Sequence, residues 1–173
     1  KKIAYCSSDR KKDGLFLGRP IFENLTSPAL NAISQYGFNF GSTEQDYSKN
    51  LAKEFLIDVK RMFDESGLLS GGNQQKVALG KWLSIQPDVL LVNEPTRGVD
   101  VGEKTDKDQR MRDLAARGIT INFASTDIQE ITYLPDRVIT YYRAMMIDEH
   151  RIENIRTPTI MKEITDPFNE TNL

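Results

Sequence analysis

Two stretches, Leu69–Lys76 (LSGGNQQK) and Val89–Asp100 (VLLVNEPTRGVD), decide the fold that the sequence predicts. In the first, Ser70 is well placed as an N-cap before two glycines, and a helix is expected to continue to about Ile85, where a proline ends it. In the second, the continuous apolar run Val89–Val92 indicates a strand buried on both faces, which ends at an acid and a sharp turn. This succession of turn, helix, strand and acid is typical of an α/β domain.

Outward from these stretches, strands and helices alternate along the chain. We expect strands at Ile3–Cys6, Ile119–Ala124, Val138–Tyr142 and Met145–Ile147, helices at Glu44–Leu56, Lys104–Arg117, Ile128–Leu134 and near Ile160–Ile164, and loops at Asp9–Gly14 and 31–43. The alternation predicts a mostly parallel sheet, with a helical block at about 25–85 inserted into it. Because Thr120 and Asn122 interrupt its apolar residues, the strand at 119–124 is expected to be half-exposed.

Composition excludes several classes of function. The 173 residues are 39% hydrophobic and 28% charged with a net charge of −2, which suits one globular domain and gives no indication of nucleic-acid binding. The single cysteine, Cys6, lies in an apolar segment and is expected to be a small buried hydrophobe, in keeping with a reducing compartment. No apolar run approaches the roughly 20 residues of a membrane span, and the first residues do not resemble a signal peptide.

Together, the two stretches resemble the ATP-binding domains of ABC transporters: Leu69–Lys76 resembles the signature motif, and Val89–Asp100 the Walker B strand, catalytic glutamate and D-loop. The resemblance is greatest to the second ATPase half of bacterial sugar-type importers, such as those for ribose, galactose or autoinducer. Asp9–Leu15, Glu23–Leu25 and Glu94–Gly102 also match that subfamily. It implies a P-loop NTPase-like fold with a mostly parallel sheet and an inserted helical subdomain.

The resemblance also implies roles for the signature residues. Ser70, Gly71 and Gly72, followed by Gln74, would face the γ-phosphate of ATP held by a partner domain. Glycines allow close backbone approach, and a helix N-terminus favours an anion. The alternative is that these residues only form a tight helix start.

Two acids follow the same resemblance. Glu94 would be the general base that polarises the attacking water, and Asp100 would be the D-loop aspartate that contacts the opposite domain. Taken alone, Glu94 could be a solvated loop acid, and Asp100 could be a turn residue or a cap of the following helix.

Several positions depart from the family pattern. Asn93 replaces the Walker B aspartate that helps to hold Mg²⁺, and the loss of charge should weaken metal binding. Ser8 falls at the Q-loop position and Thr126 at the switch-histidine position. The only histidine, His150, is expected at the surface, and Ala144 occupies a hairpin position where positive φ is unfavourable.

No G-x-x-x-x-G-K-[ST] motif occurs in the 173 residues, so no Walker A loop is recognised. We therefore expect a partial ABC ATPase domain over 1–173, incomplete at its N-terminus, with a helical subdomain at about 25–85 and a Walker B core and C-terminal part at about 86–173. An uncovered sheet edge should favour self-association.

The favoured function is that of an energy-coupling ATPase domain, or part of one, of a sugar-type importer. Alone it is expected to be inactive, with weak or absent binding of ATP and Mg²⁺, but it could complete a partner's nucleotide site. The implied partners are a second ATPase domain in a head-to-tail dimer, membrane permease subunits and, indirectly, a periplasmic sugar-binding protein. The implied location is the cytoplasmic face of the membrane.

Two alternatives remain. The chain could be an inactive remnant or interaction module, which Ser8, Asn93 and Ala144 favour, or an unrelated small α/β binding protein, which would require both motifs to be coincidental.

Overall fold

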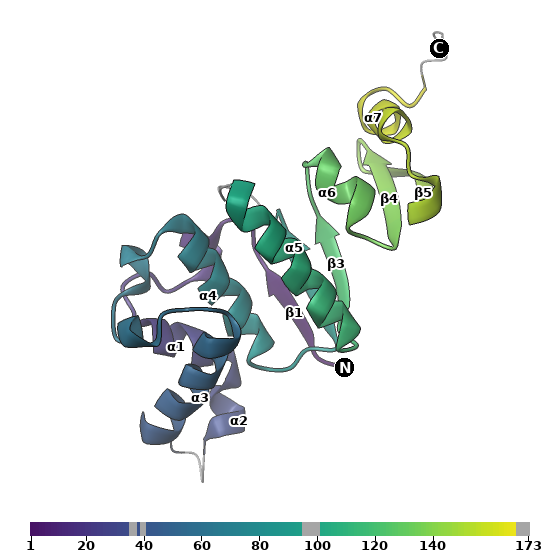
Figure 1. Ribbon diagram of the computed structural model, residues 1–173. Helices are drawn as coiled ribbons and strands as arrows, with labels where there is room; N and C mark the ends of the chain where they lie inside the picture. Colours follow the sequence, from purple (N-terminus) through teal and green to yellow (C-terminus); the bar gives the residue numbers. More distant parts are fainter. Residues whose placement is uncertain (35–37, 39–40, 95–100, 169–173) are drawn as a thin grey trace. The chain divides into compact units, whose positions relative to one another are not determined.

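A computed structural model describes residues 1–34, 38, 41–94 and 101–168, without the side chains of 101–107 (Figure 1). The chain divides into two compact units, Lys1–Ala124 and Ser125–Leu173. The boundary at 85/86 expected from the sequence remains a prediction.

The first unit is built on a parallel sheet, as predicted. Its described strands are β1 (Ile3–Cys6), β2 (Val89–Asn93) and β3 (Thr120–Ala124), in the order β1-β2-β3. Ala4 is opposite Leu90, and Leu90 is opposite Ile121. The connection between β2 and β3 includes helix α5 (Val101–Ala116), which ends before Gly118 at φ +90°.

Burial of β2 differs from the expectation. Leu90 and Val92 are buried, whereas Val89 and Leu91 are half-buried, so the prediction of full burial on both faces is wrong. The two faces are covered unequally, and the even apolar run of the sequence does not reveal this. In β3 the expected half-exposure is confirmed, because its residues alternate between exposed and half-buried.

Four α-helices in the described part of the first unit precede β2 in the sequence. They are α1 (Ile21–Thr26), α2 (Leu30–Ile33), α3 (Gly41–Glu54) and α4 (Gly71–Leu83), and α1 contacts both α3 and α4. A Cβ atom on Gly80 of α4 would lie 3.0 Å from Leu25 Cδ2 and 3.1 Å from Phe55 Cδ2. A side chain here would require Leu25 or Phe55 to shift by a few tenths of an ångström, so glycine suits this close approach of α1 to α4.

Short helical turns replace part of the expected loops. Arg10–Gly14 is one turn of π-helix, and helices extend into both ends of the segment 31–43.

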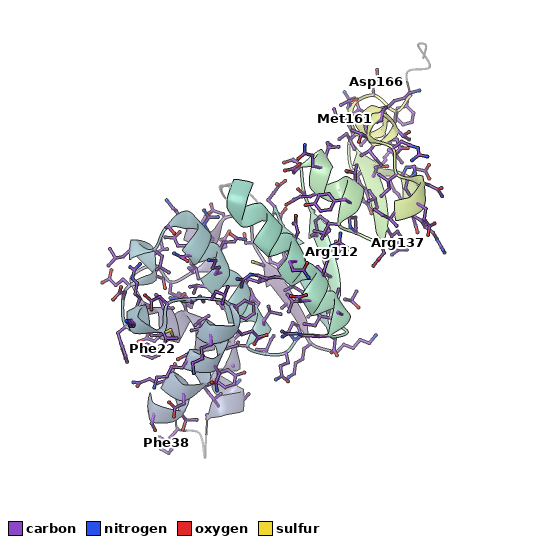
Figure 2. The ribbon with its side chains drawn as sticks, viewed as in Figure 1. Phe22, Phe38, Arg112, Arg137, Met161 and Asp166 are labelled. Carbon is purple, nitrogen blue, oxygen red and sulfur yellow. The ribbon has the colours of Figure 1, made fainter. Side chains whose placement is uncertain are left out.

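An aromatic pair and several short turns also belong to the structure. The ring centroids of Phe22, which is labelled in Figure 2, and Phe63 lie 5.5 Å apart. Turns of 3-10 helix lie at Ser27–Ala29, Val59–Arg61, Ser66–Leu68 and Ile152–Asn154.

The second unit contains α6 (Ile128–Tyr133), the hairpin of β4 (Arg137–Tyr142) and β5 (Met145–Arg151), and α7 (Thr157–Thr165). The predicted antiparallel hairpin is confirmed. Val138, Ile155 and Ile160 form its core, and α7 packs on β4.

In the described part of the chain, no helix is both long and apolar enough to cross a membrane.

Candidate functional site

The site begins at the first turn of α4. Ser70, with φ −59° and ψ 158°, is the N-cap, and its Oγ accepts hydrogen bonds from Asn73 N at 3.5 Å and Asn73 Nδ2 at 3.1 Å. The predicted N-cap is thus confirmed. Ser70 is exposed and Gly71 and Gly72 are half-buried, so the N–H groups of this turn lie near the surface.

The glutamines after the glycines face inward. Gln74 is only 5% exposed, and its Nε2 donates to the carbonyl oxygens of Ser66 at 3.3 Å and Gly67 at 3.4 Å. Gln75 is also buried, and its Oε1 accepts a hydrogen bond from Arg10 Nη1 at 3.1 Å. These side chains hold the start of α4 against the turn Ser66–Leu68 and the segment after β1.

Two of the predicted site residues come together at the carboxyl edge of the sheet. Asn93 ends β2, and Ser8 follows β1, which is the neighbouring parallel strand. Asn93 Nδ2 donates to Ser8 Oγ at 3.4 Å. This edge is where α/β sheets place their ligands.

Glu94 follows Asn93 in a left-handed conformation, with φ 50°. Its backbone N–H donates to the carbonyl of Ala124 at 2.8 Å, which completes the last pair of β2 with β3, Asn93 with Ala124. A non-glycine residue at positive φ costs roughly 1 kcal/mol, and such residues cluster at functional sites. Asp100 lies outside the described residues.

The switch-position residue Thr126 belongs to the second unit, in the loop that begins α6. Asp127 caps that helix by accepting a hydrogen bond from Gln129 N at 3.0 Å. Ser125 Oγ donates at 2.7 Å to Glu130 Oε2, which belongs to a buried carboxyl group. This loop is therefore held by short local contacts on both sides of Thr126.

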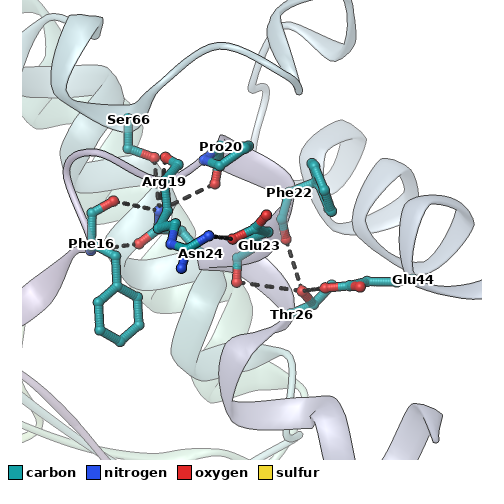
Figure 3. Close-up of polar contacts among 9 residues, drawn as sticks. All are labelled: Phe16, Arg19, Pro20, Phe22, Glu23, Asn24, Thr26, Glu44 and Ser66. Carbon is teal, nitrogen blue, oxygen red and sulfur yellow. Dashed lines mark hydrogen bonds and ion pairs between the residues drawn. The ribbon is translucent and has the colours of Figure 1, made fainter. Parts of the chain in front are cut away.

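Sequence reasoning missed the structural role of Asn24, which it noted only as part of a family match. Figure 3 shows this fully buried side chain: its Oδ1 accepts from Phe16 N at 2.8 Å, and its Nδ2 donates to Phe16 O and Ser66 Oγ, each at 3.0 Å. Asn24 thereby links the segment before α1 to the turn that precedes Leu69–Lys76. An amide among the apolar residues of a helix face was the available signal.

The sequence also did not indicate the structural role of Lys81. It is buried on α4, where its Nζ donates to Gly14 O at 3.1 Å and lies 4.6 Å from the ring centroid of Phe16. Burial lowers the pKa of Lys81, because the charged ammonium loses hydration. This contact ties the middle of α4 to the turn Arg10–Gly14.

The expectation that His150 lies at the surface is wrong. Its side chain is 13% exposed, and Nε2 lies 3.0 Å from a carboxylate oxygen of Glu163 on α7. The sequence could not show this contact, because α7 returns to the hairpin only in the tertiary structure.

The fold defines the class of protein. A dimeric ATP-binding cassette bound to ADP and Pi matches with a TM-score of 0.75 at 20% identity, over 90% of this chain and 65% of that one. A nucleotide-free cassette from an ABC transporter matches with a TM-score of 0.70 at 18% identity, over 87% of this chain and 61% of that one. The chain has the fold of ABC ATPase cassettes, which confirms the predicted fold class.

The relatives found by sequence belong to a narrower group than the structural matches. The ribose import ATP-binding protein of Roseobacter denitrificans is 36% identical over 160 residues, which are 92% of this chain and 31% of that protein. That of Streptococcus agalactiae is 40% identical over 147 residues, which are 85% of this chain and 30% of the relative. The chain is homologous to these ATP-binding proteins and spans less than a third of their length. No family model matches it.

Proposed function

We propose that this chain is an energy-coupling part of a sugar-type ABC importer, and that it completes a partner's nucleotide site through Leu69–Lys76. The observation that carries the proposal is the exposed N-cap Ser70 at the start of a 13-residue helix, in a chain homologous to ribose import ATP-binding proteins. The aligned peptide dipoles and the free N–H groups of such a helix favour a phosphate at its N-terminus.

In this proposal, Ser70, Gly71 and Gly72 face the γ-phosphate of ATP that a partner's Walker A loop holds. The inward-facing Gln74 and Gln75 keep that turn in place through Ser66 and Arg10. The first turn of α4 could therefore receive the phosphate without any movement of the Gln74 and Gln75 side chains.

The other predicted residues serve the chain's own nucleotide-facing edge. Glu94 is proposed as the general base, Asp100 as the contact to the opposite domain, and Ser8 and Thr126 as residues near the nucleotide. Asn93 would offer an amide oxygen to Mg²⁺, but its amide nitrogen is directed at Ser8 Oγ and it carries no charge. We therefore expect the isolated chain to bind MgATP weakly and to hydrolyse none.

The partners follow from the same proposal. They are a second ATPase domain in a head-to-tail dimer, membrane permease subunits and, through them, a periplasmic sugar-binding protein. The dimeric cassette among the structural matches supports the first of these. The chain would then act at the cytoplasmic face of the membrane, held there by the permease.

A second candidate is an interaction module that keeps the fold without productive nucleotide binding. The contact between Asn93 and Ser8 favours it, because an amide and a hydroxyl stand where the family places a carboxylate and a longer amide.

The deciding experiment is ATP hydrolysis by an equimolar mixture of this chain with an ATPase domain that carries Walker A but has an inactivated signature motif. We expect the mixture to hydrolyse ATP faster than either protein alone, and Ser70→Ala to lower the gain roughly tenfold or more, since one donor to a developing charge is commonly worth that much. Ser34→Ala, at the end of α2, is the matched control and should leave the gain unchanged.

An equilibrium titration of the isolated chain with ATP, with and without Mg²⁺, accompanies this experiment. No gain in the mixture would favour the interaction module. MgATP hydrolysis by the chain alone, abolished by Glu94→Gln, would contradict the proposal that it acts only with a partner.

A further inference from the structure

The second unit gathers three potential metal ligands on one side of its hairpin. They are Asp148 and His150 of β5 and Glu163 of α7, and one ligand atom from each lies within 4.8 Å of the others. His150 Nε2 is 3.0 Å from both carboxylate oxygens of Glu163 and 3.8 Å from Asp148 Oδ2. The cluster belongs to none of the motifs that support the nucleotide-site proposal.

The local fold explains why these residues meet. Asp148 and His150 are two apart on a strand and therefore share a face, whereas Glu149 between them points to the other side. Glu163 follows Ile160 by one helical turn, and Ile160 is buried in the core against the hairpin. The packing that buries Ile160 therefore also directs Glu163 toward His150.

A buried hydroxyl holds the carboxylate. Thr140 lies opposite Asp148 in the hairpin register, and its Oγ1 donates to Glu163 Oε2 at 2.7 Å. The side chains of His150 and Glu163 are each 13% exposed, whereas that of Asp148 is 61% exposed. His150 and Glu163 are thus largely shielded from water, and the Thr140 hydroxyl supports Glu163 by a hydrogen bond, as is common for metal ligands. Asp148, the third residue, is exposed to water.

The distances leave room for a metal ion among these atoms. An imidazole nitrogen this close to three carboxylate oxygens either donates its N–H to them or directs its lone pair at a cation that the oxygens share. Ligands bound at about 2.0–2.1 Å in a tetrahedron lie about 3.3 Å apart. The nitrogen–oxygen distances of 3.0 and 3.8 Å lie on either side of that value.

We propose that Asp148, His150 and Glu163 bind one divalent cation of the zinc class, with water at the exposed position. Imidazole favours such borderline metals over Mg²⁺ or Ca²⁺, and two carboxylates neutralise the 2+ charge. The bound ion would link β5 to α7 and stabilise the second unit. This site is independent of the proposed nucleotide function.

The test uses the fact that His150 is the only histidine of the chain. In the ¹⁵N-labelled full chain, one set of imidazole signals reports directly on Nε2. We expect Zn²⁺ to shift Nε2 at one equivalent, Co²⁺ to give the visible absorption bands of a four- or five-coordinate ion, and Mg²⁺ to have no effect. Zn²⁺ should also raise the unfolding temperature, because it binds only the folded state.

Variants separate the ligands from their surroundings. His150→Gln and Glu163→Gln should each weaken Zn²⁺ binding by at least about 100-fold, since even loss of a supporting partner commonly costs 10–100-fold. Glu149→Gln is the matched control: it makes the same substitution as Glu163→Gln and is adjacent to His150 on β5, but the partner of Glu149 is Arg137 at 3.0 Å, and Zn²⁺ affinity should stay within about twofold.

Circular dichroism without metal confirms that each variant is folded before its binding is compared. If Zn²⁺ leaves the imidazole signals unchanged, the cluster is held by hydrogen bonds between His150 and Glu163 without a metal ion, and the proposal is wrong. Equal weakening by Glu149→Gln would mean non-specific attraction to acidic residues and would overturn it as well.

Discussion

Asn24 shows how much of the fold rests on one side chain. It is fully buried, and its amide satisfies backbone atoms of Phe16 together with the Ser66 hydroxyl. Phe16 O also accepts a hydrogen bond from Arg19 N, but Phe16 N and the Ser66 hydroxyl would lose their Asn24 partner. A buried polar group left without a partner costs about 1–3 kcal/mol.

We therefore expect Asn24→Ala to lower the free energy of unfolding by about 2–4 kcal/mol, as for other buried hydrogen-bond networks. Urea denaturation followed by circular dichroism measures the change. Asn31→Ala, at an exposed position of α2, is the control and should stay within about 0.5 kcal/mol. Equal effects of the two changes would show that the Asn24 contacts carry little stability.

Lys81 predicts a pH dependence. Its pKa in the folded state lies below the ordinary value of 10.5, so between these two values the unfolded chain binds more protons than the folded one. The contribution of Lys81 to stability should therefore rise with pH through this interval and level off above 10.5. In Lys81→Met this rise should be absent when unfolding free energies are measured from neutral pH upward.

Tyr47 predicts a pH dependence of stability with the opposite sign to that of Lys81. Burial, followed by the charge of Glu54, raises its pKa above 10.0, so its stabilising contribution is complete below that pH and falls above it. Tyr47→Phe should remove part of the alkaline loss of stability. If Lys81→Met had the same effect as Tyr47→Phe, the sign inferred for Lys81 would be wrong.

At the scale of elements, the hairpin turn has the wrong residues for its shape. Arg143 and Ala144 connect β4 to β5 with φ values of 46° and 64°, the two positive values of a type I′ turn. Asparagine and glycine are favoured there because a Cβ atom crowds the backbone at positive φ. The expectation that Ala144 is unfavourably placed is confirmed.

Ala144→Gly should accordingly stabilise the second unit by about 1 kcal/mol, as removal of left-handed strain at one residue predicts. Hydrogen exchange of the amides of β4 and β5 reports this unit directly. The same substitution at Ala115, exposed in the last turn of α5, should instead be destabilising, because glycine is a poor helix former. A loss of protection in Ala144→Gly would argue against the turn geometry.

At the scale of the whole molecule, β1 is an edge of the described sheet. It pairs with β2 on one side, and Ile3 and Tyr5 are 63% and 50% exposed. An edge strand with exposed apolar residues is a site where another strand can add. The self-association expected from the sequence remains a prediction, and this edge is its physical basis.

Ile3→Lys should reduce self-association, since charged residues on edge strands oppose pairing between chains. Sedimentation velocity over a range of concentrations measures the shift toward monomer. Leu56→Lys, which adds the same charge at an exposed apolar residue away from the sheet, is the control and should change nothing. A monomeric parent chain at all concentrations would contradict the prediction.

Most of the element pattern could be predicted from the sequence because it depends on local spacing. The N-cap at Ser70, the strand after Asp88, the helix that ends before Gly118 and the closing hairpin all follow from neighbouring residues. The contact between Asn93, at the end of β2, and Ser8, two residues after β1, was not predicted, although the carboxyl ends of adjacent parallel strands lie at the same edge of a sheet. Burial was harder to predict, as Leu91 shows, because it depends on elements that arrive from elsewhere in the chain.

The sequence by itself determined the class of fold and the motif order, because the positions of capping residues, glycines and apolar runs are local and their spacing is specific. Only the tertiary structure decided the contacts of Asn24, Lys81 and the cluster around His150. In each case the partner lies on another element, and its distance and burial arise when those elements pack. The contacts of side chains that link separate elements therefore could not be predicted from the sequence.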